Sequence, residues 1–106
     1  MSCLIEFEKM PWNEAAKGLR FKAFVSSNQQ IRLVEFSEGF TEPKWCSRGH
    51  AGYVIDGEFA NDYSGKIERY QKGDVIFIPG GEEAKHKAIL GKGEKVTLLL
   101  FEVIEG

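Results

Sequence analysis

Cysteine and histidine are scarce in this sequence, which has two cysteines, Cys3 and Cys46, and two histidines, His50 and His86, in 106 residues. Such a count excludes a disulfide framework, because frameworks of that kind need a dense and even set of cysteines. A zinc site built from cysteine and histidine alone would use nearly all four residues. Metal-dependent or acid–base chemistry must therefore depend on these few side chains and on the more numerous carboxylates.

Excess basic charge and long apolar runs are also missing. The sequence has 14 Lys and Arg residues and 16 Asp and Glu residues, which gives a net charge of −2. Proteins that bind nucleic acids or anionic membranes usually have a basic surface. The longest strongly apolar stretch, residues 96–101, is too short to cross a bilayer. The N-terminal MSCLIEFEK carries acids where an export signal is basic and then apolar. We therefore expect a cytoplasmic protein that binds neither nucleic acid nor membrane.

Glycine, in contrast, is abundant, with 12 residues. These glycines separate short runs rich in Val, Ile, Phe and Tyr, a pattern typical of an all-β barrel or sandwich. The length fits one domain, and a hydrophobic share of 42% is enough for a packed core. We expect strands at residues 21–25, 31–36, 53–55, 58–63, 66–70, 75–78, 86–90 and 96–104.

Local patterns add further predictions. Asp56-Gly57 predicts a tight hairpin turn, and Ser64-Gly65 predicts the next turn. The continuous apolar run at residues 75–78 suits a strand buried on both faces. The helix-like stretch is short, at residues 12–18. Apolar segments near both ends of the chain, such as Leu4-Ile5, favour a homodimer.

Two segments resemble the sequence motifs of the cupin family. Residues 73–81, GDVIFIPGG, are similar to the second cupin motif, which has a Gly, five residues, Pro-x-Gly, two residues and a metal-binding His. Residues 53–58, YVIDGE, are similar to the end of the first motif. With motif 1 at about 44–57 and motif 2 at about 73–88, the resemblance implies a single cupin domain over residues 1–106. Its fold would be a double-stranded β-helix, or jelly-roll, barrel.

The resemblance also indicates where the family places its metal ligands. The first motif is His-x-His, three or four residues, Glu, six residues, Gly. Alignment on Gly57 puts Lys44 and Cys46 at the two His positions and His50 at the Glu position. The second motif puts Ala84 at the third His position. None of the family's ligand types is at its own place, which implies that the usual metal site is lost or rebuilt.

A rebuilt site is one interpretation. Cys46 and His50 occupy positions where the family points ligands inward, and alternation along a strand gives His86 the same facing as residue 84. Glu42 is a candidate fourth donor. Thiolate and imidazole ligands favour a divalent transition metal such as Zn, Fe or Cu. In the alternative interpretation, both histidines line a pocket through hydrogen bonds and Cys46 packs as a small apolar residue.

Other side chains near the motifs suit a ligand pocket at the barrel mouth. Lys44 or Arg48 could bind an anionic group, unless they are simply solvated. Trp45 and Tyr53 could form an apolar wall with a polar tip, unless they belong to the core. The predicted pocket comprises Lys44, Trp45, Cys46, Arg48, His50, Tyr53 and His86.

Three functions remain open at this point. The first is binding of a small-molecule ligand without the usual metal. The second is a metal-dependent enzyme, such as a dioxygenase or isomerase, with a Cys46, His50 and His86 site. The third is a non-catalytic structural or regulatory domain. The missing ligand types favour the first over the second, and the gathering of Cys, His, Lys and Trp in the motif regions favours both over the third. A Cys46–His50 nucleophile pair is also conceivable, although the sequence identifies no third group to orient it.

Overall fold

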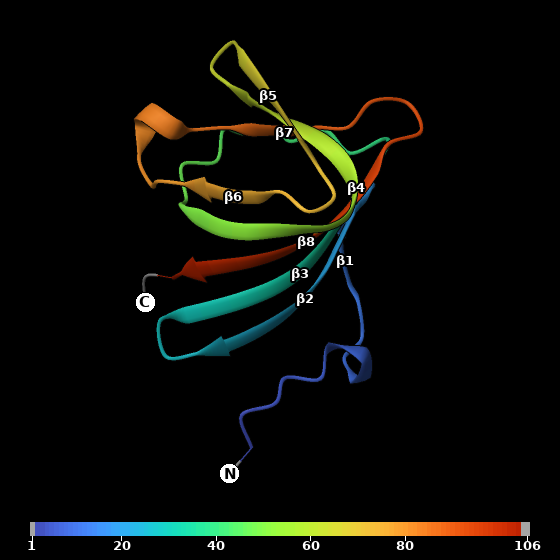
Figure 1. Ribbon diagram of the computed structural model, residues 1–106, viewed down its shortest axis with the longest axis vertical. Helices are drawn as coiled ribbons and strands as arrows, with labels where there is room; N and C mark the ends of the chain where they lie inside the picture. The colour runs from blue at the N-terminus through green and yellow to red at the C-terminus, as the bar shows by residue number, and fades with distance from the viewer. Residues whose placement is uncertain (1, 105–106) are drawn as a thin grey trace.

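One long strand, β4 (His50–Tyr63), connects the two halves of a curled antiparallel sheet (Figure 1). The structure is a computed structural model that describes residues 2–104, so Met1, Glu105 and Gly106 of the expected domain lie outside it. The other elements are η1 (Phe7–Lys9), β1 (Asn13–Ala16), β2 (Leu19–Ser26), β3 (Gln29–Ser37), β5 (Lys66–Gln71), β6 (Val75–Ile78), η2 (Glu82–Ala84), β7 (Lys87–Ile89) and β8 (Lys95–Val103). Within the described residues no helix is long and apolar enough to cross a membrane.

The sheet runs in the order β1-β2-β3-β8-β4-β5, and β6 and β7 also pair with β4. The first part of β4 lies between β8 and β6, whereas its last part lies between β5 and β7. Because one strand takes part in both arrangements, the sheet curls around an interior (Figure 1). The predicted all-β class is confirmed, and the curled sheet fits a jelly-roll barrel.

The bend in β4 occurs at Gly57, whose φ is +81°. The register against β8 shifts between Val54 and Asp56, as at a β-bulge. A Cβ atom at position 57 would lie 1.9 Å from the carbonyl oxygen of Lys95, so this close approach requires glycine. The predicted hairpin at Asp56-Gly57 is therefore wrong: the chain bends here but stays in one strand.

Alternation along the strands places the core on the inner side of the sheet. On β8, Val96, Leu98 and Leu100 are buried, and the residues between them face outward. β6 alternates in the same way, since Ile76 and Ile78 are each 5% exposed but Val75 and Phe77 are 78% and 77% exposed. The prediction that β6 is buried on both faces is wrong.

The N-terminal helix prediction at residues 12–18 is also wrong. Residues 13–16 form β1, which pairs with β2 through a turn at Gly18, where φ is +76°. The indole of Trp12 lies under the guanidinium of Arg20, 4.1 Å from the ring centre, and so holds this hairpin against the sheet. The remaining predicted strands are found within a few residues of their expected bounds, as is the turn at Ser64-Gly65.

Candidate metal and ligand site

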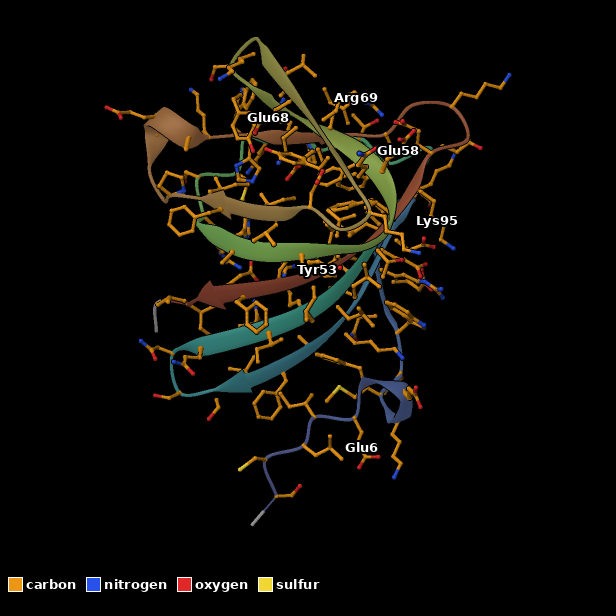
Figure 2. The ribbon with its side chains drawn as sticks, viewed as in Figure 1. Glu6, Tyr53, Glu58, Glu68, Arg69 and Lys95 are labelled. Atoms are coloured by element: carbon orange, nitrogen blue, oxygen red, sulfur yellow. The ribbon has the colours of Figure 1, made fainter. Side chains whose placement is uncertain are left out.

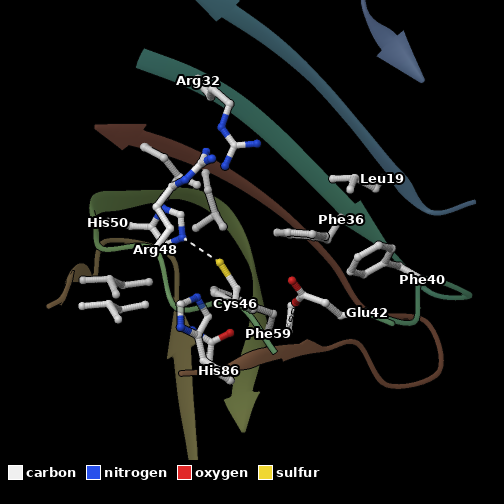
Figure 3. A pocket seen from close by; sticks show the side chains of 16 residues that line it. Leu19, Arg32, Phe36, Phe40, Glu42, Cys46, Arg48, His50, Phe59 and His86 are labelled. Carbon is white, nitrogen blue, oxygen red and sulfur yellow. Dashed lines mark hydrogen bonds between the residues drawn. The ribbon is translucent and has the colours of Figure 1, made fainter. Parts of the chain in front are cut away.

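The curled sheet encloses a cavity of about 150 Å³ (Figure 3). Its wall is mainly apolar and includes the aromatic rings of Phe36, Phe40 and Phe59. The polar side chains in the wall are Arg32, Glu42, Cys46, Arg48, His50, Asn61 and His86. A mainly apolar cavity with a few converging polar groups is the usual form of a small-molecule site.

Cys46, His50 and His86 form a cluster in this wall. Each offers one ligand atom, and these atoms lie within 4.8 Å of one another. The Sγ atom of Cys46 is 3.8 Å from Nε2 of His50, and the two imidazole ring centres are 5.4 Å apart. The structure thus brings together the three residues that the sequence suggested as replacement ligands.

Backbone pairing holds the cluster in place. Cys46 and His86 form an isolated antiparallel bridge, in which the Cys46 N–H donates to the His86 carbonyl at 2.9 Å and the His86 N–H donates back at 3.0 Å. His50 is the first residue of β4, four positions beyond Cys46. Motif 1 and the end of motif 2 therefore meet directly at the cluster.

The other nitrogen of each imidazole has a partner outside the cluster. His50 Nδ1 is buried and lies 2.6 Å from Oε2 of Glu102. The contact is an ion pair rather than an aligned hydrogen bond, because the carboxylate lies off the N–H direction. His86 Nδ1 lies 3.1 Å from the carbonyl oxygen of Ala84. These contacts fix both rings and leave Nε2 as the nitrogen available to the cluster.

Glu102 is a buried acid that the sequence analysis missed. Its carboxylate accepts hydrogen bonds from Nε and Nη2 of Arg32 at 2.6 and 2.8 Å, and from Nε2 of Gln30 at 2.9 Å. Nη1 of Arg48 lies 3.8 Å away. The sequence did carry a signal, because Glu102 continues the inward positions of Val96, Leu98 and Leu100 along β8.

These contacts change the acidity of the cluster. The hydrogen bond with His50, and then that with His86, lowers the pKa of Cys46 from 9.0 to about 5. Burial, the largest single influence, works against the charged form of both histidines. Contacts with Cys46, together with Glu102 for His50 and the Ala84 carbonyl for His86, outweigh it and raise the pKa of each. Burial would raise the pKa of Glu102, yet His50 and Arg32 lower it to about 2. The cluster thus favours a thiolate beside positively charged imidazoles.

Glu42 lines the same cavity but is not among the residues whose ligand atoms lie within 4.8 Å of one another. Its Oε1 accepts a hydrogen bond from the backbone N–H of Ala88 at 2.8 Å. Burial raises the pKa of Glu42, and the neighbouring thiolate of Cys46 adds to the shift. Glu42 is therefore a carboxyl group near the cluster rather than a fourth member of it.

Three residues of the predicted pocket lie elsewhere. Trp45 is 39% exposed, with the ammonium groups of Lys87 and Lys85 over its ring. Tyr53 is 44% exposed on the outer side of the sheet (labelled in Figure 2), and Lys44 is exposed in the loop before β4. None of the three lines the cavity, which corrects this part of the pocket prediction. In their place β2 and β3 supply wall residues with no local motif: Leu19, Arg32 and Phe36.

The comparisons with known proteins point to one fold. No family model and no curated protein matches the sequence. The polyketide cyclase RemF from Streptomyces resistomycificus has a TM-score of 0.84 at 20% identity, covering 99% of this chain and 81% of that one. KdgF from a Halomonas species has a TM-score of 0.76 at 20% identity, covering 99% and 96%. An RmlC-like cupin from Shewanella frigidimarina has a TM-score of 0.76 at 17% identity, covering 99% and 93%.

At these identities the similarity is one of fold, and no specific activity follows from it. The solved structures that match also include a Cupin 2 conserved barrel protein from Salinispora arenicola, with a TM-score of 0.74 over 95% of this chain. The chain has the cupin barrel fold, and its structural neighbours are cupin proteins.

Proposed function

We propose that this protein binds a divalent transition-metal ion through Cys46, His50 and His86, and that it holds a small molecule in the adjoining cavity. One observation carries the proposal. The three donors converge, while the second nitrogen of each imidazole contacts a carboxylate or a backbone carbonyl. Metal-binding histidines are nearly always supported in this way.

The donor set fits such an ion. One thiolate and two imidazoles match the ligands of zinc sites in which three protein groups leave a fourth position for water or substrate, and iron and copper accept the same donors. A bound ion would supply Lewis-acid chemistry by polarising an oxygen of the ligand. Oε1 of Glu42 is engaged by the Ala88 amide, so the second carboxyl oxygen of Glu42 can hold or accept a proton from a molecule in the cavity.

Metal analysis tests the proposal. Protein purified without a tag or chelator should bind about one equivalent of Zn²⁺, and the His50→Ala/His86→Ala variant should bind none. Co²⁺ in place of Zn²⁺ should give a thiolate-to-metal charge-transfer band that Cys46→Ser abolishes. Cys3→Ser, which removes the exposed thiol, should keep the band. Protein that binds no Zn²⁺, Fe²⁺ or Cu²⁺ would refute the metal site and leave the interpretation as a metal-free small-molecule binder.

A second candidate, thiol chemistry, is favoured by the line of groups that runs from Cys46 through His50 to Glu102. Glu102 supplies the orienting group for a nucleophile and base pair. Metal binding and thiol chemistry compete for Cys46, because a thiolate bound to an ion is not free to attack. Alkylation of Cys46 with and without metal therefore separates them.

We also propose that the protein forms a homodimer through the outer sheet face. This face is defined by residues that lie opposite one another across β6, β4, β8, β3 and β2, in two apolar rows: Phe77, Ala51, Phe101, Ile31 and Phe24, and beside them Val75, Tyr53, Leu99 and Leu33. Exposed fractions reach 78% at Val75 and 77% at Phe77. Monomers seldom leave more than about 300–600 Å² of contiguous apolar surface uncovered.

A second copy of the chain fits this face because a two-fold axis brings the same flat patch of both copies together. The N-terminal segment contacts the β2 end of the face, where Nζ of Lys22 donates to the carbonyl of Phe7. Phe77→Lys should convert a dimer to a monomer in sedimentation or light scattering. Ile67→Lys, at an exposed apolar position on β5, should remain dimeric. A monomeric parent at micromolar concentration would refute the dimer.

A further inference from the structure

We infer that the cavity ligand is a small organic anion, whose carboxylate or similar oxyanion pairs with Arg48 while its apolar body lies against Phe36, Phe40 and Phe59. This inference deepens the proposed function, since it rests on ligand binding in the cavity, but it does not depend on the metal ion.

The guanidinium of Arg48 is a cation that the fold leaves without a close partner. Within the described residues its nearest carboxylate is Glu102, at 3.8 Å, beyond hydrogen-bond distance. Both oxygens of Glu102 are already occupied, Oε1 by Nε of Arg32 at 2.6 Å and Oε2 by Nη2 of Arg32 at 2.8 Å. The Arg48 side chain is 49% exposed and lines the cavity. Its donors are therefore free for a ligand.

The charges around this part of the cavity do not balance. Two guanidiniums, those of Arg32 and Arg48, lie 2.6 and 3.8 Å from the carboxylate of Glu102, so these three groups together carry one excess positive charge. A divalent ion bound by a single thiolate would add a second excess positive charge. Among the described residues, Glu42 is the acid that lines the cavity, and Figure 3 shows it across Cys46 from Arg48. Where water is partly excluded, such an excess favours an anion and disfavours a cation.

The shape of the cavity defines the rest of the ligand. The ring centres of Phe36 and Phe40 are 5.0 Å apart and those of Phe36 and Phe59 are 6.3 Å apart, so the three rings form one continuous wall. The volume is about 150 Å³, and an apolar cavity of roughly that size, about 150 Å³, holds a benzene ring. A single guanidinium matches a carboxylate in a two-pronged contact. These features together select a small aromatic or branched aliphatic carboxylate.

Benzoate and benzamide make a matched pair of probes, because they share a shape and differ in charge. With metal-free protein, direct coordination of the carboxylate by an ion plays no part. We expect calorimetry or ligand-observed NMR to show benzoate binding at least about tenfold tighter than benzamide, since a hydrogen bond to a charged group is stronger than one between neutral groups. Added salt should weaken the binding of benzoate and leave the binding of benzamide unchanged.

Arg48→Gln should reduce benzoate affinity to that of benzamide and leave benzamide unchanged. Lys44→Gln is the matched control, because it removes one cation from the same loop at a residue that does not line the cavity, and it should keep the preference for benzoate. Equal binding of the two probes by the parent, no binding of either, or an unchanged preference in Arg48→Gln would overturn the inference. Metal binding without a preference for benzoate would overturn only this inference. A preference for benzoate without metal binding would support it and refute only the metal site.

Discussion

His50 and Glu102 are joined by a buried contact of 2.6 Å between Nδ1 and Oε2. This contact connects the Cys46 cluster to an ion pair between β8 and β3, because Glu102 is also held by two nitrogens of Arg32. The ring of His50 is therefore fixed from behind the cavity. Positioning of the cluster and stability of the sheet thus depend on the same carboxylate.

Glu102→Gln should be strongly destabilising. The substitution keeps the side-chain shape but leaves Arg32 and His50 without their counter-charge in a largely buried setting. Removal of one partner from a buried ion pair costs about 3 kcal/mol of the free energy of unfolding. Urea denaturation measures this loss. The Arg32→Leu/Glu102→Leu double variant should lose less stability than the sum of the losses in Arg32→Leu and Glu102→Leu. Additive losses would contradict the pairing.

Acid should remove the contribution of Glu102. Its pKa in the folded protein is about 2, against 4.5 ordinarily, so its stabilising effect is complete above pH 4.5 and is lost as the pH falls toward 2. The raised pKa of His50 works in the opposite sense, and its contribution is lost when the pH rises through that value. The difference in stability between the parent and Glu102→Gln should shrink in urea titrations from pH 5 to about pH 2.5. A constant difference would show that folding does not lower the pKa of Glu102.

Cys46 should react as a thiolate in slightly acidic solution when no metal is present. Because its pKa is lowered from 9.0 to about 5, mainly by His50, iodoacetamide should alkylate Cys46 at pH 6 much faster than an ordinary thiol. A Cys3→Ser background removes the other thiol, and mass spectrometry follows the reaction. Addition of His50→Ala should slow it at pH 6.

Zn²⁺ provides the second arm of the alkylation experiment. One equivalent should protect Cys46 if the proposed metal site is correct, because the ion occupies the sulfur. Fast alkylation that Zn²⁺ does not slow would favour thiol chemistry instead. A rate that rises only near pH 9 would contradict the thiolate itself.

Much of the fold and part of the site could be predicted from local patterns. The two motifs indicated that Cys46 and His50 point into a barrel and that His86 could join them. Alternation from position 84 is not what places His86, because residues 82–84 form η2 and His86 lies in an isolated bridge with Cys46. In contrast, the partnership of Arg32 with Glu102 joins residues 70 positions apart, and no local pattern reports such a distance. The exposure of Phe77 could not be predicted either, because an apolar run is the same whether its outer face is covered by the chain or left for a partner.

The sequence DG at positions 56–57 shows why the strand pattern was also ambiguous there. Asp-Gly is the strongest signal for a tight hairpin, but the same positive φ serves a bulge inside a longer strand. The outcome was decided by long-range pairing, since Gly57 lies opposite Val96 of β8. Only the partner strand distinguishes the two geometries.

Gly57→Ala should therefore be among the most damaging small substitutions in the chain. Its Cβ would lie 1.9 Å from the carbonyl oxygen of Lys95, in addition to the cost of a φ of +81° for alanine. We expect a loss of at least about 3 kcal/mol in the free energy of unfolding, because β4 and β8 must separate to relieve the contact.

Gly65→Ala is the control, since Gly65 also has a positive φ, +105°, but nothing lies within 4 Å of its Cβ position. It should lose only about 1–2 kcal/mol, the conformational cost alone. Chemical denaturation compares the two variants, and equal losses would mean that the bend in β4 is not held by its approach to β8.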